Sequence, residues 1–165
     1  MAVPSSPLGL MVAFKVSPDV LSRVQDIANF DLSRVMEQHV RMSHQFPGRY
    51  TDVEDGAKRA RLELDLKRYL ALPLLFPNRE HDLVPRLAVD LLWHAFILNT
   101  TLYRAFCDRV YGRYLDHVPA ANRAKRLKED EGRPLEHTLE SLNLAFGGYD
   151  PDSWQVPAIC SCNFG

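Results

Sequence analysis

A helical pattern between residues 85 and 111 constrains the fold of this chain more than any other feature. Pro85 is placed for the first turn of a helix, and Gly112 suits the left-handed position just past a helix C-terminus. Most positions between them are apolar, around nearly the whole helical circumference. A helix of this kind is buried on most sides, so residues 85–111 are predicted to form a long central helix.

Start and stop signals predict further helices around this one. Ser17 followed by Pro18 is an N-cap and first-turn pair, and Thr51 or Asp52 is expected to cap a later helix. The expected ranges are about 17–29, 31–46, 51–72 and 134–147. No strand pattern extends beyond isolated short stretches. The predicted fold class is therefore all-α, a four- to five-helix bundle with an irregular C-terminal tail.

Length and composition indicate one domain of ordinary type. The chain has 165 residues and a formal net charge of -1, which argues against nucleic acid as a partner. No apolar run is long enough to span a bilayer, so no membrane partner is expected. Three cysteines do not form a secreted disulfide framework, which favours a cytoplasmic protein. Residues 1–150 are expected to form a single helical domain and 151–165 a loop or tail.

A narrow polar stripe interrupts the apolar surface of the central helix. Its members on a helical wheel are Asp90, His94, Thr101 and Asp108. One interpretation, which spacing alone favours, is a solvent-facing edge with ion pairs Arg86–Asp90 and Arg104–Asp108. The other is a metal site, because a carboxylate and an imidazole four residues apart on a helix converge on one point.

The block from the central helix to Pro119 contains a recognisable set of twelve positions. They are Asp90, Trp93, His94, Phe96, Ile97, Tyr103, Cys107, Tyr111, Gly112, Leu115, His117 and Pro119. This set resembles the glycine-rich domain-containing protein-like family, and the resemblance extends over residues 60–148. It implies that Asp90, Trp93, His94 and His117 form one unit, and it implies no particular reaction. The chain departs from the bacterial pattern at Phe96 and Asp116, where many members have histidine.

These observations lead to a metal-binding hypothesis. Asp90, His94, His117 and Asp116 are predicted to line a small polar pocket that binds a divalent metal (Zn, Fe or Mn) or an unknown small ligand. Metal-assisted chemistry with His117 as acid or base would follow if the site were catalytic. The alternative is a protein-interaction or scaffolding module in which Asp90 and His94 fix helix packing and His117 caps a helix.

The remaining histidines and cysteines carry weaker signals. His39 lies on the apolar face of its helix, where a core histidine is favoured over a metal ligand. Cys160 and Cys162 are spaced to hold a soft metal or form a redox pair, yet no second cysteine pair completes a zinc site. A disordered tail is therefore the favoured interpretation of these two cysteines.

Overall fold

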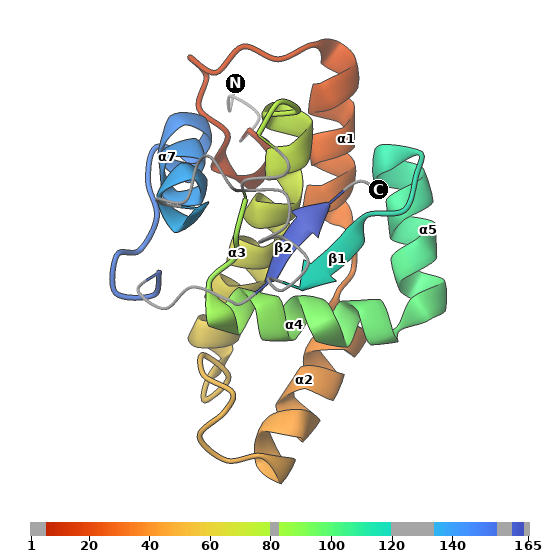
Figure 1. The fold of residues 1–165 in the computed structure, drawn as a ribbon, viewed down its shortest axis with the longest axis vertical. Coiled ribbons are helices and arrows are strands. Elements are labelled where there is room, and N and C mark those ends of the chain that lie inside the picture. Colours follow the sequence, from red (N-terminus) through yellow and green to blue (C-terminus); the bar gives the residue numbers. More distant parts are fainter. Residues whose placement is uncertain (1–5, 80–82, 120–133, 155–159, 164–165) are drawn as a thin grey trace, which may run out of the picture.

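The computed structural model describes residues 6–79, 83–119, 134–154 and 160–163, and it is built mainly from helices (Figure 1). The predicted all-α class is confirmed. A short 3-10 helix, Pro7–Gly9, precedes six α-helices in these ranges. They are α1 (Pro18–Asn29), α2 (Ser33–Gln45), α3 (Gly56–Leu75), α4 (Leu87–Leu98), α5 (Thr100–Tyr111) and α7 (Pro134–Phe146).

Several helix ends lie where local signals predicted them. The Ser17 side chain accepts a hydrogen bond from the Val20 amide at the start of α1. Gly112 follows α5 in a left-handed conformation, with φ of 69°, and α7 begins at Pro134. These signals work because each depends on atoms within one or two turns of the helix end.

The predicted long central helix is in fact two helices that meet at Asn99. The Asn99 side-chain amide donates to the Ala95 carbonyl, which would accept the Asn99 backbone N–H in a continuous helix. The Asn99 N–H bonds the Phe96 carbonyl instead, and the same side chain also donates to Gln38 of α2. This side-chain competition for backbone partners ends α4, and α5 then leaves in another direction (Figure 1).

Helix α3 differs from its predicted bounds at both ends. Asp55, rather than Thr51 or Asp52, caps it by accepting a hydrogen bond from the Lys58 amide at 2.8 Å. The helix then continues through Pro73 and ends at Leu75. Asp52 lies before the helix with a positive φ of 63°, and its carboxylate contacts Arg86.

The C-terminal segment is less irregular than predicted. Strand β2 (Cys160–Asn163) pairs in antiparallel fashion with β1 (Asp116–Pro119), which follows α5. Trp154, within the predicted tail, is 2% exposed and belongs to the hydrophobic core. The strand pairing has no local signal, because each strand has only four residues and its partner is distant in sequence. The burial of Trp154 likewise depends on residues distant in sequence.

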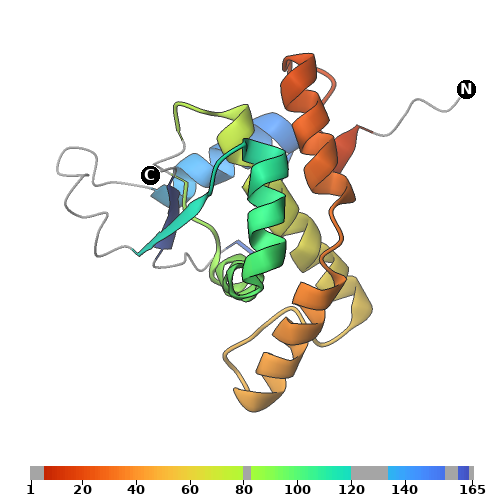
Figure 2. The ribbon, with the colours of Figure 1, turned by 90° about the vertical axis from the view of Figure 1, so that its right-hand side faces the viewer.

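Helix α4 lies in the middle of the packing. It contacts α2, α3 and α5, and α2 lies next to it at the lower end of the molecule in both views (Figures 1 and 2). Trp93 and Phe96 of α4 are fully buried, as the apolar pattern required. In the described parts of the chain, no helix combines the length and apolar character needed to cross a bilayer.

Candidate metal centre

The candidate site is built on the buried carboxylate of Asp90 in α4. Asp90 is 4% exposed, so its oxygens need polar partners to offset their lost hydration. Oδ1 lies 2.8 Å from His117 Nε2, and Oδ2 lies 3.4 Å from His94 Nδ1. Both histidine rings therefore lie beside one buried carboxylate.

His94 lies one turn after Asp90 on the same helix. Its Nδ1 is 2.6 Å from the Asp90 backbone carbonyl oxygen. A carbonyl oxygen only accepts, so Nδ1 carries the hydrogen and the lone pair of the neutral ring lies on Nε2. The His94 side chain is 46% exposed. Solvent or a ligand can therefore reach the site from this side.

His117 reaches Asp90 from strand β1. An ionised carboxylate only accepts, so His117 Nε2 donates its proton to Asp90 Oδ1. The His117 ring packs on Trp93, with ring centroids 4.6 Å apart, and against His94 at 4.3 Å. Only 11% of the His117 side chain is exposed. The two rings and the carboxylate thus form a compact cluster with one exposed member.

The ligand-type atoms of Asp90, His94 and His117 all lie within 4.8 Å of one another. Three of the four predicted site residues are thereby brought together. Asp116 is not part of this group, since it is exposed and precedes His117 directly on the strand. Successive strand residues point to opposite faces, so Asp116 and His117 lie on opposite faces of β1.

The solvent-edge interpretation of the polar stripe does not describe the helix. Asp90 is buried, and Arg86 pairs with Asp65 and Asp52 instead of Asp90. The break at Asn99 also separates Asp90 and His94 on α4 from Thr101 and Asp108 on α5. These four residues would lie on one face only if residues 85–111 formed one continuous helix.

A buried hydrogen-bond chain positions the turn that leads to His117. Trp93 Nε1 donates to the Tyr103 hydroxyl at 3.1 Å, and that hydroxyl donates to the Leu115 carbonyl at 2.7 Å. Leu115 lies two residues before His117 and is fully buried. These two hydrogen bonds thereby fix the start of β1 relative to α4, which carries Asp90 and His94.

We expect Tyr103→Phe to lower the free energy of unfolding by about 1–3 kcal/mol, because Trp93 Nε1 and the Leu115 carbonyl lose a buried partner. Chemical denaturation would measure the loss. Tyr114→Phe is the matched control, since Tyr114 is 44% exposed and its hydroxyl takes no part in the hydrogen bonds from Trp93 to Leu115. Equal, small effects of the two substitutions would contradict the positioning role of Tyr103.

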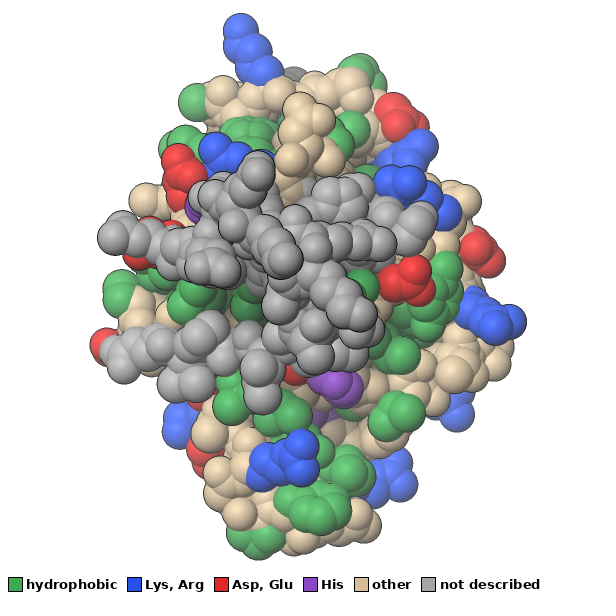
Figure 3. Space-filling model, viewed as in Figure 1, with side chains coloured by type: hydrophobic (Ala, Val, Ile, Leu, Met, Phe, Trp, Pro, Cys, Tyr) green, Lys and Arg blue, Asp and Glu red, His purple; other side chains and the backbone are tan. Residues whose placement is uncertain are grey.

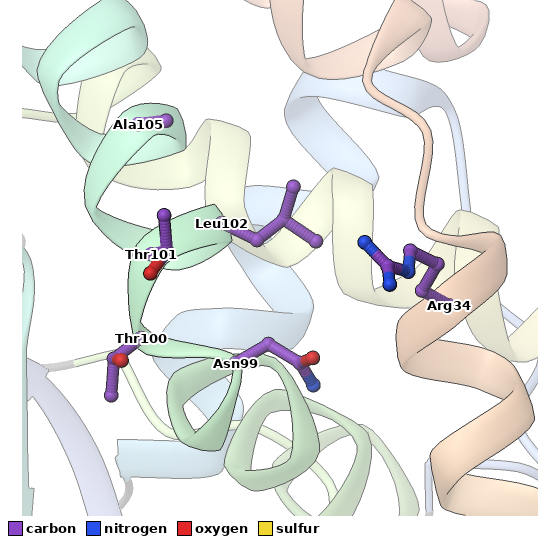
Figure 4. Close-up of a pocket in the computed structure, with 6 residues that line it drawn as sticks. All are labelled: Arg34, Asn99, Thr100, Thr101, Leu102 and Ala105. Carbon is purple, nitrogen blue, oxygen red and sulfur yellow. The ribbon is translucent and has the colours of Figure 1, made fainter.

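An open pocket of about 350 Å³ lies beside the start of α5 (Figure 4). It is lined by Arg34, Asn99, Thr100, Thr101, Leu102 and Ala105. Arg34 reaches toward it from α2, whereas the other five come from the break and the first turns of α5. None of the six is an aspartate, glutamate, histidine or cysteine, so this pocket lacks the usual metal ligands.

Histidine is also visible at the surface. On the face seen in Figure 3, histidine atoms lie near the middle, with hydrophobic side chains beside and below them. Leu87 and Leu98 of α4, the helix that carries His94, are 38% and 70% exposed. The exposed part of the cluster therefore lies on a helix with apolar surface at both ends.

The fold and the site together define a class of protein: an all-α domain in which one carboxylate and two imidazoles lie close together. The UCP032817-like family model matches residues 22–142, so the chain belongs to the UCP032817-like family. Comparison with curated proteins gave no match, and comparison with solved structures gave none.

This family assignment corrects the resemblance to the glycine-rich domain-containing family, which was wrong. Half of the positions that suggested it are core residues: Trp93, Phe96, Tyr103, Cys107, Tyr111 and Leu115 are all buried. Many helical proteins select aromatic and aliphatic residues at such positions for packing alone. The structural grouping of Asp90, His94 and His117 does not depend on that resemblance, because it rests on distances.

Proposed function

We propose that this chain binds one divalent transition-metal ion through Asp90, His94 and His117. The observation that carries the proposal is the convergence of their ligand atoms within 4.8 Å, from a helix and a strand that are separate in sequence. Two imidazoles and one carboxylate are ligands that Zn, Fe and Mn accept.

The spacing of Asp90 and His117 fits two ligands of one ion after a small adjustment. Two ligands at about 2.0–2.1 Å from a tetrahedral ion lie about 3.3 Å apart. Asp90 Oδ1 and His117 Nε2 are 2.8 Å apart, because a proton lies between them. The ion would replace that proton, and the two side chains would separate by a few tenths of an ångström.

Three protein ligands leave at least one coordination position for another group. The exposed side of His94 gives access to that position from solvent. A bound ion would supply Lewis acidity and would lower the pKa of a coordinated water. Within the site, the Asp90 carbonyl orients the His94 ring through Nδ1, and Trp93 supports the His117 ring.

Metal titration tests this proposal directly. Calorimetry and elemental analysis of the purified chain should show one Zn²⁺ or Mn²⁺ ion per chain. Asp90→Asn and His117→Ala should weaken binding at least about tenfold, since changes even outside the ligand shell have effects of this size. His44→Ala is the control, because His44 is exposed on α2. The proposal fails if the native chain takes up no stoichiometric metal or if all variants bind equally.

The hydrogen bond between His117 and Asp90 supports a second candidate, a protein-interaction module. In that case the buried 2.8 Å contact fixes β1 on α4, and the exposed leucines of α4 provide apolar contact surface. The same samples distinguish the candidates. A structural role predicts a large stability loss in metal-free His117→Ala with no metal bound by the native chain.

A further inference from the structure

An open groove of about 510 Å³ lies between α2 and α3. Met36 and Val40 of α2 line it, and both side chains are partly buried against the hydrophobic core. The two residues are four apart in sequence, so they lie on one face of α2, one turn from each other. None of the lining residues belongs to the candidate metal centre, so the groove is a separate surface of the protein.

Four charged side chains border these apolar residues: Glu37 and Arg41 on α2, and Arg59 and Glu63 on α3. Glu63 is already in an ion pair, since its Oε1 lies 2.8 Å from Lys67 Nζ. Glu37 and Arg41 are exposed, and neither side chain forms a hydrogen bond or ion pair with another described residue. Both charges on α2 therefore remain available to a partner.

The two arginines lie toward the same end of the groove. Helices α2 and α3 run in opposite directions (Figure 1). Further along α3, Lys67 Nζ donates to the Ala28 carbonyl at 3.1 Å, and Ala28 lies at the end of α1, which leads into α2. That part of α3 therefore lies near the start of α2. The earlier part of α3, with Arg59, accordingly lies toward the later part of α2, with Arg41.

The charges at this end of the groove are only partly balanced. Arg59 Nε donates to the Val53 carbonyl at 2.7 Å, and this neutral acceptor leaves the guanidinium positive. Asp55, which caps α3, interacts electrostatically with Arg59. Glu37 lies one turn before Arg41, toward the other end. Two guanidinium groups near one carboxylate give the arginine end a positive charge, which attracts an acidic side chain.

We propose that this groove binds an amphipathic helix of a partner protein. Apolar residues of that helix would pack on Met36 and Val40, and an acidic residue beside them would pair with Arg41 and Arg59. This combination of an apolar strip and a flanking charge is how a helix is recognised in a groove. A small molecule would remain largely in water here, because the groove is open, whereas small-ligand sites enclose most of the ligand. The proposal does not depend on the metal site.

A synthetic amphipathic peptide of about 15 residues tests the proposal, since shorter helices are marginal in water. Its leucines would share one helical face, with glutamates along one edge of that face. Fluorescence anisotropy should show saturable binding of the labelled peptide to the native chain. Arg41→Glu should weaken binding at least about tenfold, because it would bring carboxylates together. A peptide with lysines in place of the glutamates should bind Arg41→Glu more tightly than it binds the native chain.

Arg49→Glu is the matched control, because it makes the same charge change at an exposed residue that does not line the groove. It should bind the glutamate peptide as the native chain does, and circular dichroism would verify that both variants are folded. Absence of saturable binding by the native chain would overturn the proposal, as would equal binding by Arg41→Glu and Arg49→Glu.

Two further measurements separate a partner helix from other occupants of the groove. A scrambled peptide of the same composition, with its leucines spread around the helix, should bind much more weakly. Equal binding of the scrambled peptide would overturn helix recognition in favour of charge alone. Sedimentation of the native chain without peptide should show a monomer. A dimer that Arg41→Glu abolishes would assign the groove to a second copy of this chain and would likewise overturn the proposal.

Discussion

Arg86→Met is expected to lower the free energy of unfolding by about 3–5 kcal/mol, the usual result of removing one partner of a buried ion pair. Only 3% of the Arg86 side chain is exposed. Its guanidinium donates to Asp65 Oδ2 from Nε and Nη2, at 3.2 and 2.9 Å, and to Asp52 Oδ2 from Nη1 at 2.6 Å. Methionine fills a similar volume but leaves the buried Asp65 without its counter-charge.

The loss should be smaller at acidic pH. Burial raises the pKa of the Asp65 carboxyl, and the Arg86 guanidinium opposes that shift. Without Arg86 the pKa in the folded state rises further, so the folded variant takes up a proton that the unfolded chain releases. A raised folded-state pKa favours folding at low pH, and this contribution is lost as the pH rises through that pKa.

Urea denaturation of a double variant, Arg86→Met with Asp65→Leu, provides the control. Replacing both members of a buried ion pair by apolar residues is often neutral, so the double variant should recover most of the stability. Asp52 can remain, since 29% of its side chain is exposed and water can hydrate it. A single variant that loses less than about 1 kcal/mol would contradict the buried-pair account.

The helices could be predicted from sequence where their limits depend on local atoms. Ser17 with Pro18 and Gly112 each act within a turn of the helix end, and the structure confirms both. The break at Asn99 was missed because it depends partly on Gln38, from a helix distant in sequence. One interpretation of the polar stripe paired Arg86 with Asp90, four residues away, because a sequence pattern carries no information about Asp65 on another helix.

In the candidate site, too, the local contacts could be predicted from sequence and the long-range contacts could not. The i,i+4 spacing predicts that Asp90 and His94 are neighbours, and the structure places them so. The approach of His117 depends on β1 and on the Tyr103 hydrogen bonds, for which helical periodicity gives no signal. The separation of Asp116 from the cluster follows from strand alternation, which could be deduced only once residues 116–119 were known to be extended.

His39 should make the protein sensitive to acid. It lies on α2, is 1% exposed, and neither ring nitrogen has a hydrogen-bond partner among the described residues. Its ring packs edge-on against Tyr50 at 5.0 Å, which agrees with the predicted core histidine. Burial lowers the pKa of His39 to about 4, because a charged imidazolium would lose its hydration.

The direction of the pH effect follows from the two pKa values of His39. Well above about pH 6.5 the ring is neutral in both the folded and the unfolded chain, and it has no effect on the pH dependence. As the pH falls from about 6.5 to about 4, the unfolded chain gains a proton that the folded chain does not. Stability should therefore decline by about 2–3 kcal/mol in this window through His39 alone.

His39→Phe isolates this contribution, because phenylalanine retains an aromatic ring against Tyr50 and does not titrate. Denaturation curves of the native chain and the variant should differ increasingly in favour of the variant between roughly pH 7 and pH 4.5. Carboxylates of the chain affect both proteins alike, so the difference reports His39. His44→Ala, at an exposed position of the same helix, should follow the native curve. Parallel curves for the native chain and His39→Phe would show that His39 is protonated in the folded protein and that its site is hydrated.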